Sequence, residues 1–187
     1  CRYLMFWKSR ASRLDAKTFI IDKKKKYSFT KIFNLSDNYF KEVESRSLIL
    51  IQAQRDIDTI VSYLGSLRND SIPLLVDTNL SLKSFSKILD KYNPDYFIFE
   101  NDQKFKKYYF YKKIGKKYIF KIKKKNLIKL NDNLCMVMPT SGSMGDTKCV
   151  RISKDNINCV TKSIVKYLMM NNSRISISSL PLNYIYG

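Results

Sequence analysis

The stretch from Met138 to Ser153 reads MPTSGSMGDTKCVRIS, and in it an apolar run stops at Pro139 and gives way to a polar loop. The loop holds three hydroxyl residues, two glycines and one lysine: Thr140, Ser141, Ser143, Gly142, Gly145 and Lys148. Hydroxyl groups donate to phosphate oxygens, and glycines let successive backbone N–H groups point at one anion. The composition therefore predicts a polyphosphate site, with an ordinary Ser/Gly turn as the plain alternative.

Two familiar phosphate motifs do not match this loop. In the Walker A motif a lysine directly follows the second glycine, whereas Lys148 lies three residues after Gly145. The dinucleotide fingerprint G-x-G-x-x-G is also absent from the sequence. Any nucleotide held here must therefore be bound by a loop of another kind.

The chain before the loop alternates between compact apolar runs and segments with helical spacing. The strands expected from these runs are residues 18–22, 27–29, 47–52, 72–76, 96–99 and 134–138. Helices are expected between them, with Thr30 as one N-cap, Ser153 as another, and a last strand at 174–180. The pattern predicts an α/β fold, a mostly parallel sheet with flanking helices, in which ligands bind at the carboxyl ends of the strands.

Residues 104–129 carry lysine at twelve positions, interleaved with aromatic residues, and Gly115 divides them into two β-prone halves. A basic β-hairpin is predicted. Basic and aromatic side chains together suit single-stranded nucleic acid. Lysines on an edge strand also prevent edge-to-edge pairing, and strand alternation points them outward. The edge-hairpin interpretation is favoured, so nucleic acid is not the expected partner.

The composition excludes several kinds of site. The net charge is +19, and the sequence has no histidine, which rules out a Ser-His-Asp triad and a His-ligated zinc site. The four cysteines form no C-x-x-C pair, so no metal site is predicted, and scattered thiols fit a reducing compartment. No apolar stretch approaches the roughly 20 residues of a membrane span. The expected location is cytoplasmic, with no membrane partner.

The segment TSGSMGDTK resembles the phosphate-binding loop of the AMP-forming adenylate ligases, the superfamily of acyl-CoA synthetases and peptide-synthetase adenylation domains. Their usual loop is T-S-G-S/T-T-G-x-P-K-G-V. Residues 180–187, LPLNYIYG, resemble a second motif of the family, L-P-L-x-H/Y-x-Y/F-G, at the expected distance. The earlier chain is similar to the family's first strand–helix–strand units, although less specifically.

The resemblance implies an enzyme that joins a carboxylic acid to the α-phosphate of ATP, with Mg²⁺, and releases pyrophosphate. The acyl group then passes to a thiol, of coenzyme A or of a carrier protein. The implied ATP-phosphate-binding residues are Thr140, Ser141, Gly142, Ser143, Gly145 and Lys148. The implied substrate-pocket residues are Tyr184, Tyr186 and Gly187, and no catalytic residue is assigned.

The sequence departs from the family at four positions of the loop region: Met144 for threonine, Thr147 for proline, Cys149 for glycine and Lys154 for histidine. The resemblance also implies that residues 1–187 form an incomplete N-terminal AMP-binding domain, without the C-terminal part of the fold. We therefore expect no acyl-adenylate from the chain alone, and a separately encoded C-terminal half as a candidate partner. A non-catalytic relic or scaffold, and a basic nucleic-acid-binding domain, are the alternatives.

Overall fold

The computed structural model describes residues 5–8, 17–124, 129–140, 148–171 and 175–184. Its strands are β1 Thr18–Asp22, β2 Lys25–Ser28, β3 Leu48–Gln52, β4 Ile72–Val76, β5 Tyr96–Phe99, β6 Tyr108–Ile114, β7 Lys117–Ile122, β8 Leu134–Pro139 and β9 Cys149–Ser153. Its helices are α1 Phe29–Phe40, α2 Ile57–Arg68, α3 Leu82–Tyr92 and α4 Lys154–Tyr167, with a 3₁₀ turn at Phe6–Lys8.

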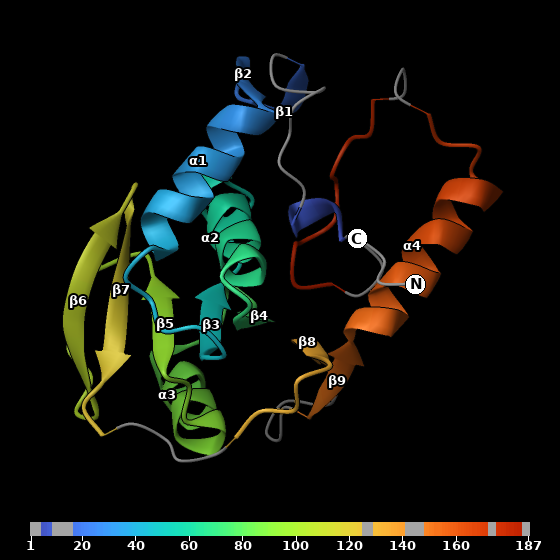
Figure 1. The fold of residues 1–187 in the computed structure, drawn as a ribbon. Coiled ribbons are helices and arrows are strands. Elements are labelled where there is room, and N and C mark those ends of the chain that lie inside the picture. Colours follow the sequence, from blue (N-terminus) through green and yellow to red (C-terminus); the bar gives the residue numbers. More distant parts are fainter. Residues whose placement is uncertain (1–4, 9–16, 125–128, 141–147, 172–174, 185–187) are drawn as a thin grey trace.

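Within the described residues, one sheet has seven strands in the order β6-β7-β5-β3-β4-β8-β9. The four central strands, β5, β3, β4 and β8, run parallel. The pairs at both edges are antiparallel: β7 with β5 and β6 on one side, and β9 with β8 on the other. The α/β prediction is confirmed, including the basic hairpin, which is β6–β7 at one edge of the sheet (Figure 1).

Helices cover both faces of the central sheet. Phe85, Ile88 and Leu89 of α3 pack on one face, where Phe97 of β5 stacks on Phe120 of β7 with ring centroids 4.6 Å apart. Helices α1 and α2 lie together on the other face (Figure 1). Because both faces are covered, β4 and β5 are buried at every position, as parallel strands usually are.

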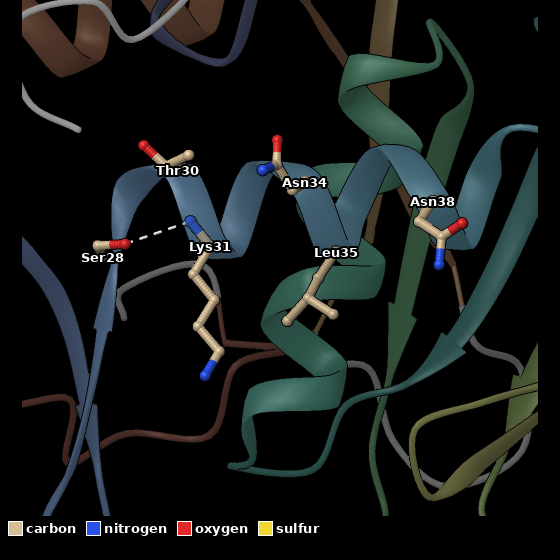
Figure 2. Close-up of a pocket in the computed structure, with 6 residues that line it drawn as sticks. All are labelled: Ser28, Thr30, Lys31, Asn34, Leu35 and Asn38. Atoms are coloured by element: carbon tan, nitrogen blue, oxygen red, sulfur yellow. Dashed lines mark hydrogen bonds between the residues drawn. The ribbon is translucent and has the colours of Figure 1, made fainter. Parts of the chain in front are cut away.

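The first hairpin is tighter than the sequence suggests. Its turn is Lys23–Lys24, both with positive φ, and β2 begins at Lys25, two residues before the predicted strand 27–29. Ser28 is the N-cap of α1, and its Oγ accepts a hydrogen bond from Lys31 N at 3.3 Å (Figure 2). The prediction of Thr30 as N-cap is wrong, because the extended backbone ends at Ser28. Ser153 does cap α4, within a full capping box.

The strand predicted at 174–180 is absent from residues 175–180, the part of it that the structure describes. The side chains of Ile175 and Ile177 are 83% and 90% exposed. A strand needs a neighbour to pair its backbone N–H and C=O groups, and β9 already forms this edge of the described sheet. Residues 175–180 do include apolar side chains, but no strand among the described residues pairs with them.

Gly65 of α2 gives a test of the packing between α1 and α2. A Cβ at this position would overlap the ring of Phe40, which is buried between the two helices and the sheet, so alanine does not fit without a shift of that ring. Gly→Ala in a helix usually stabilises by up to about 1 kcal/mol, whereas overpacking costs about 1–3 kcal/mol. We expect Gly65→Ala to lower the free energy of unfolding, measured by urea denaturation.

The double variant Phe40→Leu/Gly65→Ala provides the control, because a smaller, more flexible residue 40 leaves room for the methyl group. In the Phe40→Leu background the cost of Gly65→Ala should shrink or reverse sign. A stabilising Gly65→Ala in the wild-type background would contradict this packing.

Candidate functional site

The two ends of the polar loop are held together at the end of the β8–β9 hairpin. Pro139 is opposite Cys149 in the antiparallel ladder. Beyond this pair, both the backbone N and Oγ1 of Thr140 donate to the carbonyl oxygen of Lys148, at 2.8 and 3.1 Å. The Thr140 hydroxyl proton thus closes the neck of the loop. Ser141, Gly142, Ser143 and Gly145 lie outside the described residues.

Lys148 is exposed at this neck. Its ammonium has no ion pair with any described acidic residue. The parallel pairing of β8 with β4, with Val137 opposite Leu74, places the neck at the carboxyl edge of the parallel strands. This edge is where open α/β sheets bind their ligands. The geometry leaves Lys148 able to meet an anion.

A cleft of about 460 Å³ opens beside the loop neck, and we call it the α2–α4 cleft. Its floor is formed by Met136 and Met138 of β8, and Thr59 and Tyr63 of α2 form one wall. Helix α4 forms the other wall, with Tyr184 at the rim. A concave, mostly apolar site of this size is typical of small-molecule binding.

Tyr184, for which the sequence predicts a place in the substrate pocket, lines the α2–α4 cleft, and its side chain is half exposed. Tyr186 and Gly187 lie outside the described residues. Sequence reasoning missed Met136 and Met138, although their spacing by two along a strand already places them on one face. It had no signal for Thr59 and Tyr63, because only the fold brings α2 opposite α4.

Lys117 of the hairpin is buried at the same carboxyl edge, with a side chain only 2% exposed. Its Nζ donates to the Gln52 carbonyl at 3.3 Å and to the hydroxyl of Thr59, and lies 3.4 Å from Asp56 Oδ1. Burial lowers the pKa of Lys117, and the Asp56 carboxylate opposes this shift. The expectation that the hairpin lysines point outward is wrong here, because β7 begins against the start of α2.

The aromatic side chains of the described hairpin do not line up on one exposed face. Tyr108 and Phe120 are buried in the core, while the exposed Tyr109 and Phe110 are adjacent residues that point to opposite faces. Lysines 107, 112 and 121 pair with Asp90, Glu42 and Glu44. Successive bases need a row of exposed rings, and the described part of the hairpin offers none.

A second hollow lies along α1; it is wide open, and most of the residues that line it are polar. Figure 2 shows Thr30 and Asn34 on one side of the helix, with Lys31 and Leu35 pointing the other way. These side chains do not converge on one point, so no site is assigned there. The described residues contain no group of three or more candidate metal-ligating side chains. None of the helices they form is long and apolar enough to cross a membrane.

Comparison with known proteins shows the fold of this chain. No family model matches the sequence, and neither does any curated protein. Among solved structures, o-succinylbenzoate coenzyme A synthetase (MenE) from Bacillus subtilis in complex with AMP matches with a TM-score of 0.64 and 16% identity. The match covers 88% of this chain and 46% of that one.

Two further structures agree with this match. ATP-bound MatB from Rhodopseudomonas palustris has a TM-score of 0.64 at 14% identity, over 87% of this chain and 37% of that one. A malonyl-CoA ligase with methylmalonyl-CoA and AMP bound has a TM-score of 0.72 at 12% identity, over 97% and 39%. The chain thus has the fold of the N-terminal part of adenylate-forming ligases and spans less than half the length of these proteins.

Cys135, buried in β8, and Tyr63, in the wall of the cleft, make the free energy of unfolding depend on alkaline pH. Burial raises the pKa of the Cys135 thiol from 9.0 to about 11, and burial also raises the pKa of the neighbouring Tyr63 phenol. Both groups hold their protons more tightly in the folded state. Their contribution to stability is complete below their unfolded pKa values and is lost as pH rises through the folded ones.

We expect the free energy of unfolding, measured by urea denaturation, to fall between pH 9 and pH 11. Tyr63→Phe should make this fall shallower, because it removes one group whose pKa is raised in the folded state. Tyr109→Phe, which removes an exposed phenol, serves as the control and should leave the slope unchanged. Equal slopes for wild type and Tyr63→Phe would show that Tyr63 is not protected from ionisation.

Proposed function

We propose that this chain is the N-terminal portion of an ATP-dependent carboxylate-activating ligase, which forms an acyl-adenylate and then passes the acyl group to a thiol. The proposal rests on one observation: strand β8 contributes residues both to the α2–α4 cleft and to the neck of the polar loop. Met138 lies in the α2–α4 cleft, and Thr140, two residues later, closes the neck of the loop. An apolar substrate body and an anion are thereby held next to one another.

The chemistry needs such a juxtaposition. A carboxylate oxygen attacks the α-phosphorus of ATP, and the bond from that phosphorus to the bridging oxygen of pyrophosphate breaks. Catalysis of such a displacement is largely positioning and charge stabilisation. The loop would hold the β- and γ-phosphates, and Lys148 would neutralise the departing pyrophosphate. The hydroxyls of Ser141 and Ser143 would orient it, while Thr140 keeps the neck closed.

ATP and Mg²⁺ fit the residues present to different degrees. Lys148 is exposed, without an acidic partner among the described residues, at the end of a parallel strand, which suits a polyphosphate. Mg²⁺ favours phosphate and carboxylate oxygens, and the described residues gather no acidic cluster here. The ion would therefore be held mainly by the nucleotide's own phosphates, where it neutralises further charge.

The ligands of the similar structures support this assignment. MatB was solved with ATP, and MenE was solved with ATP and magnesium ion. The malonyl-CoA ligase contains methylmalonyl-CoA and AMP. By analogy of fold, we propose a carboxylic acid as substrate and coenzyme A or a carrier-protein thiol as acceptor. The free thiols Cys135, Cys149 and Cys159 suit a reducing compartment, and we propose the cytoplasm.

Helix α4 points to a polypeptide partner. None of its residues is buried, and Val165 and the C-cap residue Leu168, which do not line the α2–α4 cleft, are 43% and 56% exposed. Exposed apolar faces of this kind mark surfaces that bind other protein. We propose that the remainder of the ligase fold packs on this face. Without it the chain would act only as a scaffold that binds nucleotide.

The phosphate role of the loop is tested by Lys148→Ala. Removing a charge-assisted contact costs about 1.5–3 kcal/mol, so Mg-ATP affinity should fall by roughly 10- to 100-fold. Lys83→Ala, which removes an exposed lysine of α3, is the matched control and should bind Mg-ATP like wild type. Isothermal titration calorimetry distinguishes the two. Equal affinity of Lys148→Ala and wild type would overturn the assignment.

The requirement for a second half is tested by carboxylate-dependent exchange of labelled pyrophosphate into ATP. We expect no exchange above background from the purified 187-residue chain. The measurement should use a panel of carboxylic acids at saturating Mg-ATP. Exchange by the chain alone would mean that it holds all the residues that the reaction needs.

A further inference from the structure

We propose that the α2–α4 cleft takes the uncharged, apolar body of a monocarboxylic acid and excludes acids that carry a second carboxylate at their far end. The inference rests on the proposed function, because it takes the cleft to be the acid's binding site. It goes further by naming the class of acid, from the residue types that line the cleft and from the direction in which the cleft leads away from the loop.

The two methionines of β8 give the cleft a direction relative to the loop. Met138 is opposite Val150 and two residues from Thr140, so it lies at the end of the cleft nearer the loop neck. Met136 is opposite Ile152, about 7 Å further from the loop along the strand. There Tyr63 meets it, with its hydroxyl 3.6 Å from the Met136 sulfur. An acid whose carboxylate faces the loop therefore extends its far end toward Met136 and Tyr63.

The walls at the far end carry no charge. The described residues that line the cleft are aliphatic, methionine, tyrosine, threonine and asparagine, without a lysine, arginine, aspartate or glutamate. Asn156 is already engaged, because its side chain belongs to the capping box of α4. A buried carboxylate without a cationic partner costs several kcal/mol or is forced to stay protonated. Methionines, by contrast, adapt readily to apolar bodies of different shapes.

The buried cation near the cleft is Lys117, behind Thr59, and it is not available to a substrate. Its Nζ already donates to Thr59 and to the Gln52 carbonyl and pairs with Asp56. Turning it toward a ligand would leave Asp56 without this partner and would break contacts that anchor the hairpin to α2. Lys117 therefore contacts the hydroxyl of Thr59, and it is Thr59, not Lys117, that lines the cleft.

The test uses two acids of equal length, decanoate and decanedioate, without nucleotide. The chain has six methionines, and ¹³C-methyl labelling with Met136→Leu and Met138→Leu assigns the two cleft signals. We expect decanoate to shift both signals in a saturable manner. Decanedioate should require at least a tenfold higher concentration for the same shift. Equal affinity for the two acids, or no saturable shift with either, would overturn the inference.

A charge-insertion pair tests the reason for the preference. Thr161 lines the cleft and is exposed, so Thr161→Lys adds an ammonium at the cleft with little cost in folding. Ser163→Lys adds the same charge on α4 outside the cleft lining. Thr161→Lys should strengthen decanedioate binding at least fivefold, and Ser163→Lys should not. Equal effects of both variants would show that general surface charge governs the binding.

Failure of the inference is separable from failure of the proposed function. If Lys148→Ala binds Mg-ATP like wild type but decanoate still shifts Met136 and Met138, the phosphate role fails and the cleft assignment stands. If Mg-ATP binding depends on Lys148 but neither acid shifts these signals, the cleft assignment fails alone. In that case a segment of a partner polypeptide is its better occupant.

Discussion

The parallel pairing of β8 with β4 is the constraint on which the candidate site depends. It brings Val137 opposite Leu74, and so aligns the end of β8 with the carboxyl ends of the other parallel strands. The polar loop starts at that end, and Met136 and Met138 are turned toward α2. Without this pairing, the loop and the apolar cleft would be two unrelated features. With it, they become adjacent parts of one site.

The two ends of the sheet differ in how completely they are covered. At the hairpin end, aromatic side chains fill the core and the ion pairs of Lys112 and Lys121 hold β6 and β7 to the loop after α1. At the other end, α4 buries none of its residues. The loop neck, the cleft and the uncovered helix all lie toward this second end. The asymmetry is what a ligase fold needs if its remaining part packs there.

The sequence predicted the strands best where an apolar run has to be buried on both faces, as in β4 and β5. It also predicted the cap at Ser153, because local hydrogen bonds decide capping. It failed where distant partners decide the outcome. The apolar run at 174–180 lacks a neighbouring strand among the described residues, and Lys117 is buried because β7 meets α2. The cleft walls were equally hidden, since α2 and α4 are almost a hundred residues apart in the chain.

The central claim, that nucleotide phosphates and the acid body are held at the same end of β8, is tested most directly by paramagnetic broadening. Mn²⁺-ATP added to the methyl-labelled chain should broaden the Met138 signal strongly and the Met136 signal less, because Met136 lies about 7 Å further from the loop along β8. Met144, which lies in the loop itself, should broaden as well, whereas Met5, Met169 and Met170 should keep their line widths. Broadening that spares Met138, or that affects all methionines alike, would contradict a nucleotide site at this loop.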